Sequence, residues 1–238
     1  LSRGLGDVYK RQGFRILNIK QNIYYLREIL NTTMTQKKRI VVGISGASGA
    51  PLARRCLEIL NGLDGFETCL VATKGARKTI EFEDSRPFSY YKNLANTTFE
   101  IDDIGASIAS GTFKTEGMII VPCSMKTAAG IRSGYSDNLL LRAADVTLKE
   151  KRPLVLMTRE TPLSTVHLDN LAYLSALPSV HIIPPMLTYY INPTSIAEIE
   201  YHLLAKALEH FNIELPNFHR WTETAHTDNE AGGRYPEQ

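Results

Sequence analysis

The sequence predicts an α/β fold in which helices cover both faces of a mostly parallel sheet. Short apolar runs rich in Val, Ile and Leu recur along the chain, as strands that are buried on both faces require. Between these runs lie stretches whose apolar residues repeat at the spacing of one helix face. Strands that alternate with helices in this way are typical of βαβ units and of a parallel sheet.

Five runs have the length and composition of buried strands. They lie at residues 39–44, 67–73, 117–121, 153–157 and 181–183. Helices are predicted around residues 52–60, 139–148 and 168–174, where apolar residues recur at helical intervals. A last helix is predicted over residues 195–211, before a polar C-terminal stretch.

Length and composition favour one domain. The 238 residues are 43% hydrophobic, which is enough for one full core. Residues 1–33 lie outside the alternating pattern, and Met34 leads directly into the first strand-like run, so we expect the domain to span residues 34–221. We expect residues 1–33 to be a dispensable extension and residues 222–238 to be a loose C-terminal tail.

Charge and cysteine content argue against several classes of protein. The 27 basic and 25 acidic residues leave a formal net charge of +2, too small an excess to indicate a nucleic-acid-binding protein. The three cysteines are an odd number without CxxC spacing, so neither a disulfide framework nor a zinc site is predicted. A reducing cytoplasm is the simplest setting. No run of 18 or more apolar residues is present, and neither membrane insertion nor export is predicted.

Function is expected where the strands end. In open parallel sheets, ligands bind at the carboxyl ends of the strands, near the point where the strand order reverses. All five predicted strands are followed by residues with hydroxyl, charged or amide groups. These segments are residues 45–50 (SGASGA), 73–74, 122–127 (PCSMKT), 158–161 (TRET) and 184–192.

The first of these segments is a glycine-rich loop between a strand and a helix. Its small residues allow backbone N–H groups to approach an anion or a flat ring closely. It is not a Walker A loop, because no GK[ST] follows, and Ser45 stands where a dinucleotide fingerprint has its central glycine. A tight turn that binds nothing is the alternative interpretation.

The segment after the third strand carries a second set of donors. Ser124, Lys126 and Thr127 precede a helix and offer hydroxyl, ammonium and amide groups to a phosphate. The alternative is that Ser124 is an ordinary N-cap. Cys123 is predicted to be a small buried residue rather than a nucleophile, because no histidine lies near it in the sequence.

Arg142 and Lys149 are seven residues apart and therefore lie on one face of a predicted helix. Arg142 falls on a largely apolar stripe of that helix, where a charge needs an anionic partner. Asp145, three residues further on, is one candidate partner. A ligand phosphate is the other.

Charged and aromatic residues follow the last two strands. Arg159 and Glu160 are ordinarily interpreted as a salt bridge. A carboxyl group at the carboxyl end of a strand is also a candidate general acid or base. Tyr189, Tyr190 and Lys206 are candidates for a further anion site, with packing as the alternative for the two tyrosines.

Three segments, in unbroken order, resemble those of a known family. They are VGISGASGAPLARRCLEIL, PCSMKTAAGIRSGYSDNLLLRAADVTLKEKRPLVLMTRETPL and IIPPMLTYYINPTSI, the last followed by ELPNFHRW. Over residues 38–221 the chain resembles the UbiX-type flavin prenyltransferases. The resemblance implies a single Rossmann-like (flavodoxin-like) domain.

The resemblance also implies a reaction. The family joins the dimethylallyl group of dimethylallyl monophosphate to N5 and C6 of reduced FMN, and the product, prenylated FMN, serves UbiD-type decarboxylases. FMN and dimethylallyl monophosphate are therefore the implied ligands, and no metal is needed. The family forms homo-oligomers, as dodecamers with sites between subunits, so the same assembly is expected here.

The resemblance assigns roles to individual residues. Positions implied for FMN are Ala47, Ser48, Gly49, Thr73, Ser124, Met125, Lys126, Thr127 and Arg142. Positions implied around the prenyl phosphate are Lys149, Arg159, Glu160, Tyr190 and Lys206, and Glu83 and Trp221 match further positions of the active site. The expected catalytic residues are Ser48, Glu83 and Glu160, with Ser48 and Glu160 as a proton relay.

The residue types suit this chemistry. Breaking the allylic C–O bond leaves growing negative charge on the phosphate, which Lys149, Arg159 and Lys206 can stabilise. Trp221 offers a π-system to the positively charged carbon fragment. Lys206 stands where some family members have arginine, which keeps the charge and loses the bidentate fork.

A metal site is not predicted. The six histidines show no HxxxH or HExxH spacing, and no cysteine joins them. The pair Asp102 and Asp103 does not extend to the DDxxD pattern that holds magnesium in many prenyl-diphosphate enzymes, because Ala106 stands at the third position.

Two alternative functions remain at this point. An FMN-dependent cysteine decarboxylase is disfavoured, because PCSMKT stands where such enzymes show PASANT and the PxMN pattern is absent. A non-enzymatic flavin carrier would need the FMN positions without the phosphate cluster.

Overall fold

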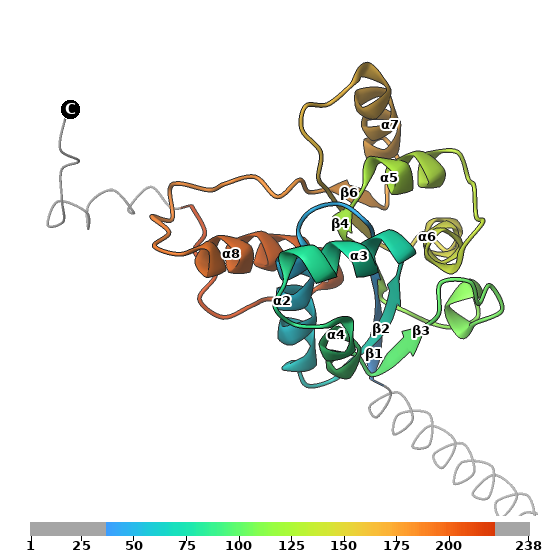
Figure 1. The fold of residues 1–238 in the computed structure, drawn as a ribbon, viewed down its shortest axis with the longest axis horizontal. Coiled ribbons are helices and arrows are strands. Elements are labelled where there is room, and N and C mark those ends of the chain that lie inside the picture. Colours follow the sequence, from blue (N-terminus) through green and yellow to red (C-terminus); the bar gives the residue numbers. More distant parts are fainter. Residues whose placement is uncertain (1–36, 222–238) are drawn as a thin grey trace, which may run out of the picture. The chain divides into compact units, whose positions relative to one another are not determined.

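The computed structural model describes residues 37–221, which fold around one six-stranded sheet (Figure 1). The predicted extension at residues 1–33 and the predicted tail at residues 222–238 lie outside the described residues, so the domain boundaries stay predictions. The strands are β1 (Lys38–Ile44), β2 (Phe66–Ala72), β3 (Thr97–Phe99), β4 (Gly117–Cys123), β5 (Leu154–Thr158) and β6 (Val180–Ile182).

The strand order of the sheet is β3-β2-β1-β4-β5-β6. The registers of β1 with β4, β2 with β3, β4 with β5, and β5 with β6 are all parallel. This is the order of doubly wound, Rossmann-like sheets, in which the direction of winding reverses between the first and fourth strands. The predicted parallel α/β fold is confirmed, and its switch point lies between the ends of β1 and β4.

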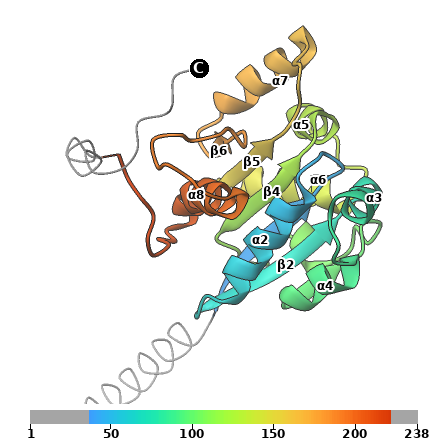
Figure 2. The same cartoon turned by 60° about the vertical axis from the view of Figure 1, so that its left-hand side comes forward.

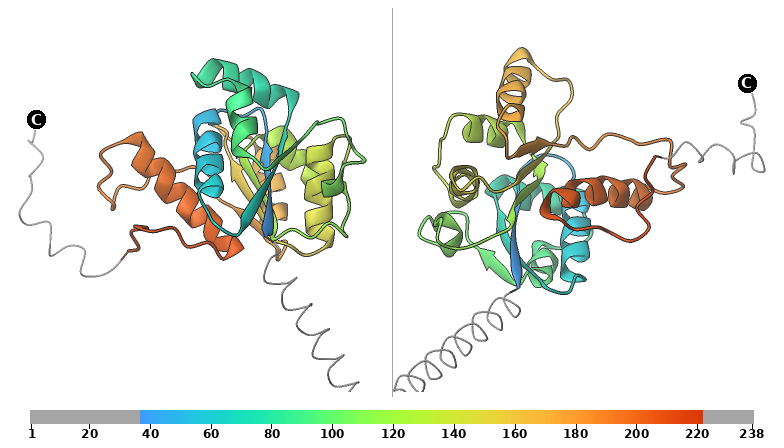
Figure 3. Two further views of the ribbon diagram at one scale, coloured as in Figure 1. Left: turned by 90° about the horizontal axis from the view of Figure 1, so that it is seen from below. Right: turned by 180° about the vertical axis from the view of Figure 1, so that it is seen from behind.

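Helices cover both faces of the sheet, as Figures 2 and 3 show. One face carries α2 (Ala50–Asn61), α3 (Lys74–Glu83), α4 (Phe88–Leu94) and α8 (Ile196–Leu208), which continues into a 3-10 turn at Glu209–Phe211. The other face carries a 3-10 turn at Ser107–Ala109 and the helices α5 (Met125–Arg132), α6 (Leu139–Lys149) and α7 (Thr165–Ser175).

Strand β1 shows how one strand serves two cores. Successive side chains of a strand point to opposite faces of the sheet. Ile40 and Val42 therefore pack with α2 and α8, and Val41 packs with α6 on the other face. The continuous apolar runs of the sequence are the consequence of this burial on both sides.

Three elements were not predicted from the sequence, namely β3, α3 and α4, and α5 was expected only from its place after the loop at residues 122–127. Strand β3 has three residues and α4 has seven, and α3 buries only Ala76 and Ile80. None of them presents an apolar stripe long enough to stand out from the sequence.

Helix α7 forms where a helix was predicted, but its apolar residues do not pack as one stripe against the sheet. Leu168 is 52% exposed, and Leu174 is the only buried residue of this helix. The physical reason is its place, because α7 lies over α5 and the edge strand β6 (Figure 1) rather than over the centre of the sheet.

The three cysteines are buried free thiols. Burial raises the pKa of Cys56 and of Cys123 to about 12 and that of Cys69 to about 11, so the thiolate needed for nucleophilic attack is disfavoured. The interpretation of Cys123 as a small buried residue is therefore supported. No helix between residues 37 and 221 has the length and apolar character needed to cross a bilayer, and the cytoplasmic location stays a prediction.

We expect Gly117→Ala to destabilise the sheet, because Gly117 begins β4 with φ at +149° and a Cβ there would lie 2.3 Å from the Pro153 carbonyl oxygen. Strain and overpacking together predict a loss of about 2–4 kcal/mol in the free energy of unfolding. Gly62→Ala is the matched control, since a Cβ at Gly62 meets nothing closer than 3.5 Å. Urea denaturation measures both, and an equal, small effect of the two substitutions would contradict the prediction.

Candidate active site

The loop after β1 is fixed to the loop after β4 by one buried side chain. Ser45 is 1% exposed, and its hydroxyl donates to the Pro122 carbonyl oxygen at 2.8 Å. The Ser45 Oγ in turn accepts from the Ser124 backbone N–H at 2.7 Å. Together with the backbone hydrogen bond from the Ser45 N–H to the Pro122 carbonyl oxygen at 3.2 Å, these bonds link the two segments on either side of the switch point.

The loop after β1 also packs closely on the start of α3. A Cβ at Gly46 would lie 3.2 Å from the Gly75 backbone, so the two glycines allow the chains to approach. Thr73 caps α3 by accepting from the Ala76 N–H at 3.0 Å, and its own N–H donates to the Ile44 carbonyl oxygen at 2.9 Å. The predicted site residue Thr73 thus lies beside the predicted loop.

Glu83, the last residue of α3, binds the start of α2. Its Oε2 accepts from the backbone N–H groups of Gly49 at 2.8 Å and Ala50 at 2.9 Å, and its carboxylate also accepts a hydrogen bond from the Ser48 hydroxyl. Gly49 has a φ of +124°, which favours glycine at this position. Two of the expected catalytic residues, Ser48 and Glu83, are thus brought into direct contact.

The environment of Glu83 favours its ionised form. Partial burial acts to raise the pKa of Glu83, but the hydrogen bonds from Gly49, Ser48 and Ala50 and the positive charge of Arg159 hold this pKa below its ordinary value. Glu83 is consequently an anion at neutral pH.

Asp84 anchors the end of α3 and so fixes Glu83. Its side chain is 5% exposed and accepts from Arg54 Nε at 2.7 Å and from the Tyr91 hydroxyl at 2.6 Å. Burial acts to raise the pKa of Asp84, but these hydrogen bonds and the charge of Arg54 bring it below its ordinary value. Helices α2, α3 and α4 therefore meet at one ionised carboxylate.

The loop after β4 begins α5. Ser124 caps this helix by accepting from the Thr127 N–H at 3.3 Å, so the N-cap interpretation of Ser124 is confirmed. Met125 and Thr127 are each 6% exposed, whereas Lys126 is exposed. The N–H groups at the start of a helix have no partner within the helix, so they remain available to an anion.

The loop after β5 contributes Arg159, whose positive charge acts on Glu83. Glu160 is exposed, and its Oε1 accepts from the N–H of the next residue, Thr161, at 3.2 Å. Within residues 37–221, no hydrogen bond joins Glu160 to Ser48. The expected relay, with Ser48 beside the flavin ring and Glu160 near the phosphate, stays a prediction.

Arg142 and Lys149 lie together on α6, as their spacing predicted, and both line a hollow of about 430 Å³ with residues 109–112. Arg142 forms an ion pair with Asp145 at 2.7 Å and donates to the Ala109 carbonyl oxygen at 3.3 Å. The structural partner considered for Arg142 is thus observed. Lys149 pairs with its neighbour Glu150.

Tyr190, Lys206 and Trp221 gather around α8. The Tyr190 hydroxyl lies 3.3 Å from Nε2 of His202, and the Tyr190 ring meets that of Trp221 edge-on, with ring centroids 5.4 Å apart. Lys206 pairs with Glu209 at 2.9 Å. Sequence reasoning missed His202, although its spacing of four residues from Lys206 places both on one helix face.

The predicted site residues therefore form three groups. The loop group contains Ser45–Gly49, Thr73, Glu83, Ser124–Thr127 and Arg159, the α6 group contains Arg142 and Lys149, and the α8 group contains Tyr190, Lys206 and Trp221. Among the described residues of these groups other than Trp221, no hydrogen bond or ion pair links one group to another. The same residues contain no cluster of three or more His, Cys, Asp or Glu side chains arranged to hold a metal ion.

The pKa of Glu83 predicts how its contribution to stability depends on pH. A lowered pKa in the folded chain stabilises the fold above the pKa of the unfolded chain, about 4.3 for Glu, and this stabilisation is lost as the pH falls through the folded value. We therefore expect Glu83→Gln to lower the melting temperature at pH 7, and the difference from wild type to disappear on acidification. Glu81→Gln is the control, since Glu81, like Glu83, is an exposed residue of the same helix, and it should show no such pH-dependent difference. A difference in melting temperature between Glu83→Gln and wild type that stays constant from pH 7 to pH 3 would contradict this prediction.

Comparison with known proteins places this geometry in a family. The family model described as Flavoprotein matches residues 28–208. A probable UbiX-like flavin prenyltransferase of Streptomyces sp. (strain D7) is 49% identical over 183 residues, which cover 77% of this chain and 91% of the relative. The flavin prenyltransferase LpdB of Lactiplantibacillus plantarum is 47% identical over 77% of this chain and 98% of its own length.

Solved structures of similar proteins share this fold. AnUbiX in complex with FMN and dimethylallyl pyrophosphate superimposes with a TM-score of 0.76 and is 42% identical, over 78% of this chain and 98% of that one. A dodecameric FMN-dependent UbiX-like decarboxylase from Escherichia coli O157:H7 has a TM-score of 0.75 at 46% identity, over 77% of this chain and 99% of that one. The FMN-dependent cysteine decarboxylase TvaF, at 12% identity and a TM-score of 0.54, shares the fold alone. With a family model that matches most of the chain and relatives of nearly half-identical sequence, the chain belongs to the UbiX-like flavin prenyltransferases of the Flavoprotein family.

Proposed function

We propose that this chain joins the dimethylallyl group of dimethylallyl monophosphate to N5 and C6 of reduced FMN and releases prenylated FMN. The observation that carries the proposal is the contact of the Ser48 hydroxyl with the ionised Glu83 carboxylate at the switch point of the sheet. The family membership of the chain supports the same reaction.

The loop group fits FMN. The amides of Gly49 and Ala50 are already occupied by Glu83, so the start of α2 is not the place for the flavin phosphate. The first amides of α5, beside the ammonium group of Lys126, are free of helix partners and suit a phosphate. Ala47, Ser48 and Gly49 then lie where the flavin ring would pass, and reduced FMN supplies the nucleophilic positions N5 and C6.

Ser48 and Glu83 can carry the N5 proton away from the flavin. Because Ser48 donates its hydroxyl hydrogen to Glu83, the Ser48 oxygen is free to accept a second hydrogen bond. A proton taken up at Ser48 Oγ can pass to the Glu83 carboxylate, whose lowered pKa keeps it ionised beforehand. Glu160 remains a candidate on the phosphate side of the site.

The cations of the three groups suit the departing phosphate. Arg159 lies in the loop group, whereas Lys149 and Lys206 lie in the α6 and α8 groups. We propose that this chain assembles into a homo-oligomer, and that subunits bring Arg142 and Lys149 of one chain to the loop group of another. The dodecamer described for the Escherichia coli relative supports such an assembly. Mass measurement of a stable, fully active monomer would contradict it.

The product is expected to leave for another enzyme. A flavin alkylated at N5 and C6 is a cofactor made for a separate reaction, and a UbiD-type decarboxylase is the proposed recipient.

The direct test mixes the protein with reduced FMN and dimethylallyl monophosphate without oxygen. Mass spectrometry should then show a flavin heavier by one prenyl unit, and a sample without the prenyl phosphate should show FMN alone. FMN that binds and stays unmodified under these conditions would identify a flavin carrier instead.

Glu160→Gln separates catalysis from binding. FMN affinity should be retained, because the proposed flavin contacts come from the loop group and Arg142. Turnover should fall by roughly 10²- to 10⁴-fold, the usual effect of removing a general acid or base. An FMN titration followed by a single anaerobic turnover measures both, and near-normal product formation by the folded variant would remove Glu160 from the mechanism.

A further inference from the structure

The Tyr190 hydroxyl has a histidine as a polar partner. The Tyr190 hydroxyl lies 3.3 Å from His202 Nε2, and the two rings meet at 83° with centroids 5.7 Å apart. His202 is 8% exposed, in contrast to Tyr190 at 47%. The buried His202 imidazole therefore holds the exposed Tyr190 phenol in place.

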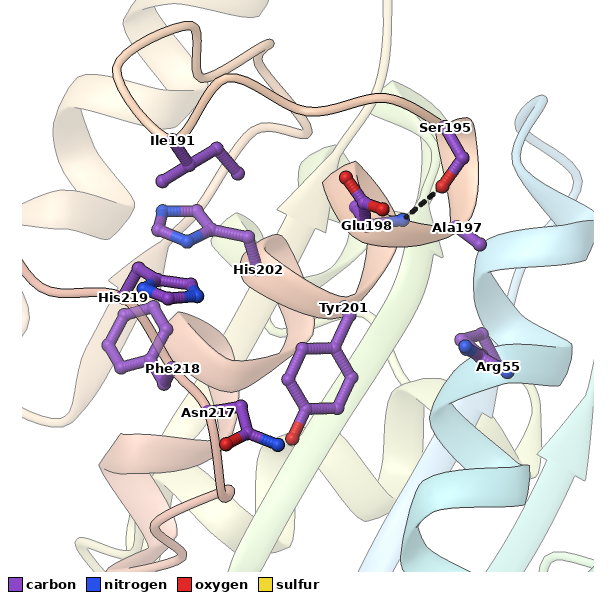
Figure 4. A pocket seen from close by; sticks show the side chains of 10 residues that line it. All are labelled: Arg55, Ile191, Ser195, Ala197, Glu198, Tyr201, His202, Asn217, Phe218 and His219. Carbon is purple, nitrogen blue, oxygen red and sulfur yellow. Dashed lines mark hydrogen bonds between the residues drawn. The ribbon is translucent and has the colours of Figure 1, made fainter. Parts of the chain in front are cut away.

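Aromatic packing fixes the imidazole in turn. The His202 ring lies against Phe218, with centroids 4.9 Å apart. Figure 4 shows His202 on α8 beside Phe218 and His219, in the wall of a hollow of about 640 Å³. The orientation of Nε2 toward Tyr190 is thus set by packing as well as by the hydrogen bond.

The direction of this hydrogen bond decides what Tyr190 can bind. If Nε2 accepts, the Tyr190 hydrogen points at His202, and the phenol turns only lone pairs toward a ligand. If Nε2 donates, the Tyr190 oxygen accepts, and its own hydrogen is free for an anion. A phosphate group with ionised oxygens requires the second arrangement.

The charge state of His202 allows that arrangement. Burial lowers the pKa of His202, and the neighbouring His219 and Lys206 side chains lower it further. The neutral ring carries one N–H, and the partner of each nitrogen selects where it resides. Within residues 37–221, Nδ1 of His202 has no hydrogen bond, so these residues do not hold the N–H at Nδ1.

We propose that His202 is a positioning residue, whose Nε2–H donates to Tyr190 and so directs the Tyr190 hydroxyl hydrogen toward the phosphate of the prenyl donor. The inference rests on the proposed function, together with the place of Tyr190 among the positions that the family resemblance implies around that phosphate. Lys206, one turn further along α8, adds the positive charge. His202 touches no reacting atom and acts through Tyr190 alone.

The test measures the affinity of the FMN-bound protein for dimethylallyl monophosphate by calorimetry, with oxidised FMN so that no turnover occurs. His202→Phe keeps an aromatic ring and removes the donor, so the dissociation constant should rise about tenfold, as expected when one hydrogen bond to a charged group is weakened. His202→Gln supplies an amide N–H at the reach of Nε2 and should restore affinity to within about threefold of wild type. FMN affinity should be unchanged in both variants.

A double substitution shows whether His202 acts through Tyr190. In the Tyr190→Phe background, His202→Phe should cause no further loss of affinity, because the two residues form one unit. His219→Phe, in the wall of the same hollow, is the matched control and should leave affinity within about twofold. In steady-state assays, KM for dimethylallyl monophosphate should rise while kcat changes little.

The outcomes separate the inference from the proposed function. If Tyr190→Phe binds the prenyl phosphate as wild type does, the proposed phosphate site is wrong. If Tyr190→Phe weakens binding but His202→Phe does not, the positioning role is overturned and the proposed function stands. Equal losses for His202→Gln and His202→Phe would show a packing role and would also overturn it. Thermal melts of each variant identify any that fail to fold. In that case the affinities of His202→Gln and His202→Asn for dimethylallyl monophosphate are compared, because the Asn amide reaches only as far as Nδ1. Tighter binding by His202→Gln supports the positioning role, and equal binding overturns it.

Discussion

The buried hydroxyl of Ser45 is the interaction on which the candidate site depends. It bridges the ends of β1 and β4 by donating to the Pro122 carbonyl oxygen and accepting from the Ser124 N–H. These strand ends flank the point where the sheet reverses its winding, and α2 and α5 begin directly after them. A hydroxyl that is buried with donor and acceptor both satisfied holds two backbones at a fixed separation. The loops that are proposed to hold FMN are thereby ordered before the ligand arrives.

Glu83 adds a second constraint by occupying the amides at the start of α2. This leaves the start of α5 for the flavin phosphate and keeps an ionised carboxylate against Ser48. The cations proposed for the prenyl phosphate lie in separate groups, in the loop after β5 and on α6 and α8. Assembly of several subunits is the simplest way to unite them. The loops at the carboxyl ends of the strands thus supply the flavin site and the proton path, and helices α6 and α8 supply cations for the anion site.

Much of this fold could be predicted from the sequence, because strands buried on both faces leave continuous apolar runs that are easy to recognise. The short elements β3 and α4 leave no such signal, and α7 keeps a helical pattern although only Leu174 is buried. Within the site, the loop after β1 and the cap at Ser124 could be predicted from local sequence. The contact of Glu83 with Ser48 and that of His202 with Tyr190 could not, since each depends on how two distant segments pack.

The affinity of a Ser45→Ala variant for FMN tests the central claim most directly. Removing the hydroxyl leaves the Ser124 N–H without its buried partner, which costs about 1–3 kcal/mol. The two segments then keep only the backbone hydrogen bond from the Ser45 N–H to the Pro122 carbonyl oxygen at 3.2 Å. We predict FMN binding weakened about tenfold or more in a folded protein, whereas Ser133→Ala, at the far end of α5, binds as wild type does. Fluorescence titration measures both dissociation constants, and wild-type affinity in Ser45→Ala would contradict the account.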